Sequence, residues 1–197
     1  MPIEDFGPAV TSVWNGLRTT TRKLVERAWH STNSPVSPSP APYDPKADGE
    51  LIELLETLDA EPIDAANSQA AIHSRRLADA CSNVLLERTQ SAEVFARLIA
   101  RAHERKDYAS VDAFAEKISD RLAPSEICEL ARSNNVVVRA LAHEAITAMP
   151  TAMLVALLRD PVDAPVAHLA LERQVAEYGS PEAKQALRDF DDFRLDY

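Results

Sequence analysis

Residues 122–146 read LAPSEICELARSNNVVVRALAHEAI, and residues 148–175 read AMPTAMLVALLRDPVDAPVAHLALERQV. The two stretches can be laid over each other with an offset of 26 to 28 residues. The matched pairs are Pro124 with Pro150, Leu130 with Leu157, Arg132 with Arg159, and Ala142 with Ala170. Residues 90–118 have the same order of helix, turn and helix at a longer spacing. One such unit leaves an apolar face open and a stacked neighbour closes it, so the repeat predicts stacked helical hairpins.

The rest of the chain beyond Asp48 also predicts helices and no strands. Apolar residues recur at three- and four-residue steps, and no alternation with a period of two is sustained. We expect a first helix capped by Asp48, a longer one near residues 71–85, and one beginning after Ser91. Another is expected near residues 111–122 and one between residues 135 and 149. Four helices are expected to open on prolines, which fit a first turn because that position needs no N–H partner: Pro124, Pro150, Pro165 and Pro181.

The second half of the chain resembles a known family of repeats. In residues 134–146 a turn with asparagine is followed by Val138-Arg139 at the start of a helix that contains Ala142. This pattern resembles HEAT-like α-solenoid repeats, over roughly residues 88–192. Asp160-Pro161 is similar to the turn between the family's helices, whereas Ala167 stands at the place of the next arginine. The resemblance implies an all-α, right-handed superhelix of roughly four or five hairpins that binds another macromolecule, and it brings no catalytic residues.

Two segments before the repeats differ from them in composition. Five of the 13 prolines fall in STNSPVSPSPAPYDPKA, which predicts an extended linker over residues 31–47. Residues 1–30 before it predict one amphipathic helix, near residues 8–29, that contains both tryptophans. We therefore divide the chain into a tethered N-terminal helix (1–30), the linker, and an α-solenoid domain (48–197).

The apolar stripe of this N-terminal helix is a candidate docking surface. An amphipathic helix on a flexible tether can lie in a partner's groove, or it can fold back and cap the core of its own solenoid. It could also rest on a membrane surface, but its polar face has only four basic residues, diluted by Glu26, so this alternative ranks lower. The sequence leaves docking on a partner and folding back equally open. The candidate docking residues are Val10, Trp14, Leu17, Leu24 and Trp29.

Charge limits the partners that we expect. The chain has 21 Lys and Arg against 31 Asp and Glu, a formal charge of −10. Residues 1–47 have five basic residues against four acidic ones, so residues 48–197 have 16 against 27. Such a field repels phosphate and anionic lipid. We therefore expect a protein partner and no nucleic acid, we rank a membrane partner below a protein one, and we take the cytoplasm as the location.

The motifs of common catalytic and cofactor sites are missing from the sequence. Only four glycines are present, and the closest two are nine residues apart, which excludes the glycine-rich phosphate loops. Cys81 and Cys128 lie on apolar stripes, where a cysteine behaves as a small hydrophobe. His103 with Asp107 and His168 with Glu172 are pairs at i,i+4, but a zinc site needs three or four ligands. We expect no catalytic residues, no metal and no cofactor.

Four residues are candidates for a binding groove of the solenoid. Arg97 and Arg101 follow Glu93 at steps of four along one helical face, and Arg139 and His143 share a face in the same way. One interpretation is a stripe that binds phosphate or acidic groups. The other is a solvated face that contains an ion pair.

These observations favour a non-catalytic protein-interaction module, a scaffold or adaptor. One alternative is an enzyme-accessory or small-ligand-binding repeat protein, which would gather His143 or His168 with an acid from a neighbouring repeat in a deep apolar pocket. Another is an acidic inhibitor that occupies the nucleic-acid site of a basic protein, with binding that weakens steeply as salt rises.

Overall fold

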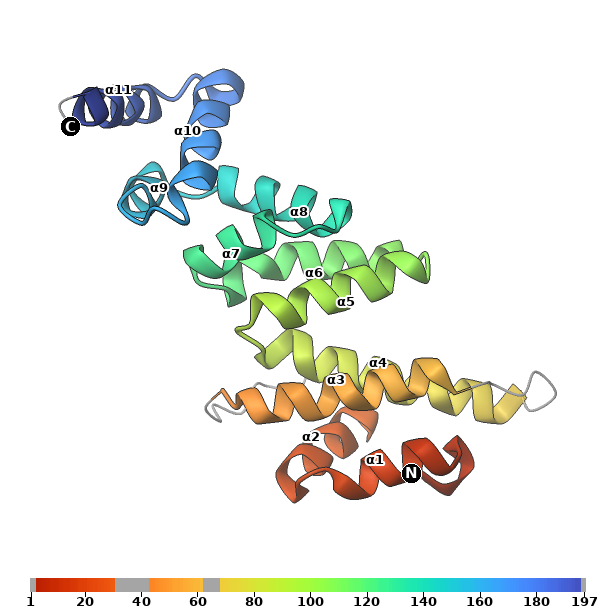
Figure 1. Ribbon diagram of the computed structural model, residues 1–197. Coiled ribbons are helices and arrows are strands. Elements are labelled where there is room, and N and C mark those ends of the chain that lie inside the picture. The colour runs from red at the N-terminus through yellow and green to blue at the C-terminus, as the bar shows by residue number, and fades with distance from the viewer. Residues whose placement is uncertain (1–2, 31–42, 62–67, 196–197) are drawn as a thin grey trace. The chain divides into compact units, whose positions relative to one another are not determined.

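The structure is a computed structural model that describes residues 3–30, 43–61 and 68–195. These residues form helices joined by turns and contain no strand, so the expected all-α class is confirmed (Figure 1). The chain consists of two compact units, residues 1–89 (unit 1) and residues 90–197 (unit 2). Within the described ranges no single helix is both long and apolar enough to cross a bilayer. The pair of helices Val136–Thr147 and Thr151–Leu157, bent by 117°, meets that test only when taken together.

Unit 1 packs its N-terminal helices on two longer ones. Its elements are η1 (Ile3–Phe6), α1 (Pro8–Gly16), α2 (Thr19–His30), α3 (Pro45–Ala60) and α4 (Ser68–Arg88). Helix α1 contacts α3, α2 contacts α4, and α3 contacts α4 (Figure 1). The core between them contains leucines of α3 and α4 that are almost fully buried, such as Leu51, Leu54 and Leu77. The division expected at residue 48 therefore differs from the packing, which groups α1 and α2 with α3 and α4.

The prediction of a single N-terminal helix near residues 8–29 is wrong, because the chain bends between α1 and α2. Leu17 adopts an extended conformation (φ −60°, ψ 144°) directly after Gly16, which favours a helix least among the nearby residues. Leu17 is 3% exposed, so the bend itself is packed. Helix α1 contacts α3 and α2 mainly contacts α4, and the break allows each to pack on its own partner.

Helix α3 begins earlier than expected. Asp44 is its N-cap and accepts a hydrogen bond from the backbone N–H of Lys46 at 3.1 Å, with Pro45 in the first turn. Asp48, expected as the cap, lies inside the helix and is 5% exposed. It accepts hydrogen bonds from the hydroxyls of Thr89 at 2.6 Å and Tyr43 at 3.0 Å. Of the expected linker, residues 31–42 lie outside the described residues, and residues 45–47 belong to α3.

Unit 2 is a succession of helices that contact one another in pairs. Its elements are α5 (Ala92–Glu104), α6 (Tyr108–Arg121), α7 (Pro124–Ala131), α8 (Val136–Thr147), α9 (Thr151–Leu157), α10 (Ala164–Tyr178) and α11 (Pro181–Leu195). Each helix of the pairs α5–α6, α7–α8, α9–α10 and α10–α11 contacts its neighbour. Contacts also join α5 with α7, α6 with α8, and α8 with α10 (Figure 1). The buried centre contains large side chains such as Phe95, Ile99 and Ile127.

The local signals for helix starts in unit 2 are confirmed. Helices α7 and α11 begin at Pro124 and Pro181, and Pro165 lies in the first turn of α10. Pro150 differs from the expectation by one position, because it is the N-cap of α9 and not part of its first turn. The side chain of Asn135 accepts hydrogen bonds from the backbone N–H groups of Val137 and Val138, at 3.0 and 3.3 Å, and so caps α8.

Two further contacts fix the ends of α5. At its start, the carboxylate of Glu126 in α7 accepts a hydrogen bond from the backbone N–H of Ala92 at 2.8 Å, which satisfies a donor that the helix cannot. At its end, Lys106 has a left-handed conformation with φ 58°. The backbone N–H of Asp107 then reaches the carbonyl of Ala102 at 2.9 Å. This is a Schellman ending, which usually has glycine at the left-handed position.

Candidate functional site

The five candidate docking residues of the N-terminus lie in or beside the core of unit 1. Val10, Trp14, Leu17 and Trp29 are buried, at 0 to 6% exposed, and Leu24 is half-buried. In this structure the N-terminal helices fold back on their own chain, as in the second alternative that the sequence left open. Docking of these side chains on a partner stays a prediction.

Trp29 is held by groups from η1 and α4. The rings of Phe6 and His73 approach it edge-on, with centroids at 6.5 and 6.1 Å. The Arg76 guanidinium lies 4.8 Å from its ring centroid and donates a hydrogen bond to the backbone carbonyl of Trp29 at 2.8 Å. A cation over an indole face is attractive, so α4 holds the end of α2 through this contact.

A polar cluster fixes the bend between α1 and α2. The Arg18 guanidinium donates to Glu50 at 2.7 Å and forms an ion pair with Asp44 at 2.9 Å. Thr21 is fully buried and its hydroxyl also donates to Glu50. Burial opposes the ionisation of Glu50, but the hydrogen bonds from Arg18 and Thr21 outweigh it and lower its pKa. Thr21, a polar residue among the buried apolar ones of α2, is therefore a hydrogen-bonding partner inside the unit.

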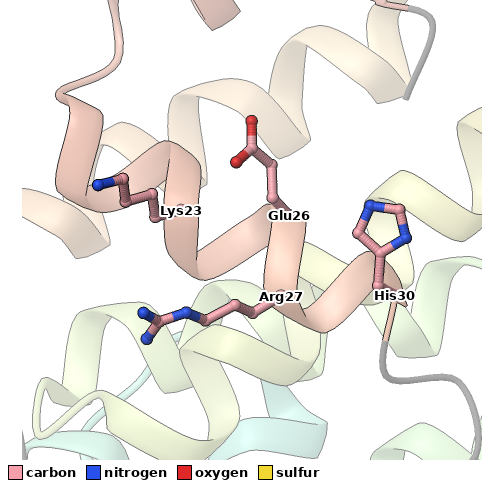
Figure 2. A pocket seen from close by; sticks show the side chains of 4 residues that line it. All are labelled: Lys23, Glu26, Arg27 and His30. Atoms are coloured by element: carbon pink, nitrogen blue, oxygen red, sulfur yellow. The ribbon is translucent and has the colours of Figure 1, made fainter.

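The outer side of α2 contains a hollow of about 350 Å³ that is open to solvent. Its described lining consists of Lys23, Glu26, Arg27 and His30, all of them exposed. Figure 2 shows that the four side chains come from one helix and spread apart rather than converge on a point. A binding site needs convergent groups, so this hollow is a weak candidate.

The two cysteines are buried, as expected. Cys81 and Cys128 are both 0% exposed. Burial, together with the charge of the nearby Asp163, raises the pKa of the Cys128 thiol to about 12. The reactive form of cysteine is the thiolate, so Cys128 is inert at neutral pH while it stays buried.

The two histidine–carboxylate pairs lie in different surroundings. His168 in α10 lies 3.6 Å from Glu172 and 3.9 Å from Asp191 of α11, and its ring faces Phe190. Asp107, the expected partner of His103, instead caps α6 by accepting from the backbone N–H of Ser110 at 3.1 Å. Among the described residues, no group of three or more His, Cys, Asp or Glu side chains has a geometry that could hold a metal ion.

The candidate groove residues of α5 take part in local charge pairs. Arg97 forms an ion pair with Glu93 at 2.8 Å, one helical turn away and exposed. Arg101 lies close enough to Asp107 to help lower the pKa of that carboxyl, after the larger effect of its hydrogen bonds from Ser110. Exposed pairs of this kind contribute little to stability.

The candidate groove residues of α8 belong to a cluster of three basic side chains, which we call the α8/α10 basic cluster: Arg139, His143 and Arg173. Arg139 and His143 are one turn apart on α8, and both are half-buried. Arg139 donates to the backbone carbonyl of Ser133 at 2.7 Å. Burial lowers the pKa of His143, and the nearby charges of Arg173 and Arg139 lower it further. The neutral form of the His143 imidazole is therefore favoured at neutral pH, and both guanidinium cations lie near it.

Two polar groups of this cluster have no partner in the described part of the chain. The Nδ1 atom of His143 is buried and makes no hydrogen bond there. Arg173 is half-buried, and no ion pair or hydrogen bond of its side chain is found among the described residues. The cluster thus concentrates positive charge in a unit that has 13 Lys and Arg against 18 Asp and Glu.

Sequence reasoning missed Arg173, which joins the cluster only through the packing of α10 on α8. The next residue, Gln174, is 6% exposed. Its Nε2 donates to the carbonyls of Thr147 at 2.9 Å and Met149 at 2.7 Å, and its Oε1 accepts from the hydroxyl of Thr151 at 2.9 Å. These bonds hold α10 beside the last turn of α8, which brings Arg173 close to His143. A second tie is the ion pair between Arg132 and the buried Asp163, at 2.8 Å.

Comparisons with models of protein families, with curated proteins and with solved structures find no match for this chain.

Proposed function

We propose that the chain is a non-catalytic protein-interaction module whose second unit is a HEAT-like α-solenoid, with its hairpins stacked in a right-handed superhelix. The observation that carries the proposal is the contact pattern of α5–α10. Consecutive helices pair, and α6, α8 and α10 contact one another in series, as do α5 and α7. Stacked hairpins contact only their neighbours and present extended surfaces, which such proteins use for binding.

The polar residues of the core support a scaffold role. Gln174 uses its amide to hold the connection between α8 and α9, and Arg132 holds the connection between α9 and α10 through Asp163. The Cys128 thiol is kept protonated by burial. These groups act on the protein's own backbone and leave the outer surface of the helices for recognition.

Surface apolar groups also support binding of another protein. Val136, Val162 and Tyr178 are 61 to 67% exposed, and Met153 is 49% exposed. Apolar and aromatic side chains with basic ones beside them are typical of protein interfaces, where they supply most of the binding energy.

The test uses the full chain, because removing residues 1–47 would uncover the core of unit 1. Tagged protein is used to capture partners from a lysate of the source organism, and each partner found is purified and titrated against the full chain by calorimetry. We expect saturable binding with a fixed stoichiometry. Native mass spectrometry of the purified chain is the control. A stoichiometric metal or small molecule there would refute the proposal in favour of the small-ligand alternative.

The salt dependence of binding distinguishes the interaction module from the remaining alternative, an acidic inhibitor of a basic protein. A module that binds through apolar contacts with a few charge pairs loses little affinity between low and moderate salt. An acidic inhibitor of a basic protein loses it steeply, because many screened pairs act together. Steep loss with a basic partner would therefore replace the scaffold function by the inhibitor function.

A further inference from the structure

We infer that the α8/α10 basic cluster is a docking site for an acidic segment of a protein partner, in which glutamate or aspartate alternates with apolar residues. This inference rests on the proposed function and names the surface and the chemistry of the partner.

The positive charge of the α8/α10 basic cluster is not balanced by carboxylates of the described chain. Arg139 on α8 and Arg173 on α10 both lie near His143, and among the described residues no carboxylate pairs with either guanidinium. Elsewhere in unit 2 the exposed Arg132 is paired with the buried carboxylate of Asp163. Half-buried cations that repel one another cost free energy, and a bound anion would remove that cost.

The guanidinium groups of the cluster also have hydrogen-bond donors that the fold does not use. Arg173 has its full fork of donors free among the described residues, and such a fork matches a carboxylate in two parallel bonds. Arg139, by contrast, donates one hydrogen bond to the backbone carbonyl of Ser133. This bond holds its guanidinium in place and leaves the other donors available.

Exposed apolar side chains flank the cluster on both helices. Val136 lies one turn before Arg139 on the same face of α8 and is 67% exposed. Leu169 lies one turn before Arg173 on the same face of α10 and is 38% exposed. Apolar surface therefore accompanies the positive charge on both helices. A segment with alternating acidic and apolar side chains would match both kinds of surface.

The same features disfavour a phosphate polymer. Neutralising a nucleic-acid backbone takes many cations in a row. Here the cluster contains two arginines and a neutral histidine, and Glu144, Glu172 and Glu177 are exposed close to them in sequence. Those carboxylates would repel any continuous row of negative charges, so acidic groups of a ligand fit only where they meet the two arginines.

The experiment measures the binding of a fluorescein-labelled peptide that alternates glutamate and leucine, by anisotropy, to the full chain. A peptide with glutamine in place of glutamate is the control ligand, and inorganic phosphate is the competitor. We expect the glutamate peptide to bind and the glutamine peptide to bind at least about tenfold more weakly, since charge-assisted bonds are lost. If phosphate displaces the peptide at equal concentration, the site is one for small anions and the inference is wrong.

Arg173→Gln is the main variant, because Arg173 has no described bond that the fold would lose. Arg188→Gln is the matched control, since Arg188 is an exposed arginine of α11. We expect Arg173→Gln to weaken peptide binding about tenfold and Arg188→Gln to leave it unchanged. Equal effects of the two variants would overturn the inference. Circular dichroism shows whether each variant is folded.

A second readout follows the His143 imidazole by NMR. Burial, and after it the two neighbouring cations, hold its pKa down. A bound carboxylate should raise that pKa, and binding should tighten as pH falls from about 7.5 to 5.5. His143→Gln should bind without that pH dependence. An imidazole titration that the peptide leaves unchanged would refute docking at this cluster.

The two proposals can fail separately. If a purified natural partner binds the unmodified chain and Arg173→Gln equally well, the interaction function stands and this docking site is wrong. If no partner binds while the glutamate peptide does, the site stands and the broader function is wrong.

Discussion

Gln174 offers the sharpest test of how unit 2 is held together. Its side chain makes three hydrogen bonds from a buried position, two of them to the backbone carbonyls of Thr147 and Met149. Both of those residues are at most 9% exposed, so water does not replace a lost donor easily. The substitution Gln174→Met keeps the length and approximate volume of the side chain and removes all three bonds.

The expected cost follows from these contacts. Each hydrogen bond contributes about 1 kcal/mol net, and leaving a buried carbonyl without a donor costs about 1–3 kcal/mol. We therefore expect Gln174→Met to lower the free energy of unfolding of unit 2 by about 3–4 kcal/mol, which corresponds to a fall of roughly 10–15 °C in Tm. Urea unfolding followed by circular dichroism measures it, and hydrogen exchange assigns the loss to α8–α10.

Gln174→Glu distinguishes lost hydrogen bonds from lost packing. A carboxylate facing two carbonyls has its pKa raised, so the folded state binds a proton more tightly than the unfolded state. Stability of this variant should then be greatest below the unfolded-state pKa, about 4.3, and should fall as pH rises through the folded-state value. The Gln174→Met deficit should be independent of pH.

The control is Gln185→Met, which changes an exposed glutamine of α11 that bonds only to Asp189 one turn away. Its effect should stay within about 0.5 kcal/mol. If Gln174→Met costs less than about 1 kcal/mol, or no more than the control, the amide does not hold α10 on α8 and the account of the basic cluster fails with it.

Three further predictions concern single contacts. Burial raises the pKa of Asp48 above its ordinary value of 3.8. Ionisation of Asp48 therefore costs stability as pH rises through the raised pKa, so in thermal unfolding the stability of Asp48→Asn relative to the wild type should increase as pH rises above about 4; a constant difference would contradict this. Glu126→Ala removes the acceptor for the backbone N–H of Ala92 and should cost about 1–2 kcal/mol in urea unfolding, whereas Glu129→Ala, an exposed glutamate of the same helix, should cost under about 0.5. Lys106→Gly relieves a left-handed conformation and should stabilise unit 2 by about 0.5–1 kcal/mol in thermal unfolding; a destabilised variant would show that the lysine stem makes contacts worth more than the strain.

The parts of the fold that could be predicted from sequence are those decided by local chemistry. Ser91, Asn135 and Pro181 mark helix starts because a hydroxyl, an amide oxygen or a missing N–H acts within one turn. The burial of both cysteines followed from their place on apolar stripes in the same way.

The parts that could not be predicted depend on contacts between distant residues. The bend at Leu17 exists because α1 and α2 pack on different helices, and Thr21 is tolerated in the core only because Glu50 lies across from it. Arg173 looked like any exposed arginine, because only the packing of α10 on α8 brings it to His143. Of the basic cluster, the i,i+4 pair on α8 was visible in the sequence and its third member was not.

The positions of the two cysteines have a practical consequence. Each unit contains one thiol, Cys81 in unit 1 and Cys128 in unit 2, and both are shielded completely. An alkylating reagent can reach either one only while the surrounding helices are transiently apart, so its labelling rate reports the free energy of that opening. Peptide mass spectrometry then measures the alkylation rates of both cysteines in one sample, one rate for each unit, without any engineered probe. A ligand that binds one unit should lower the labelling rate of the cysteine in that unit and leave the rate of the other cysteine unchanged.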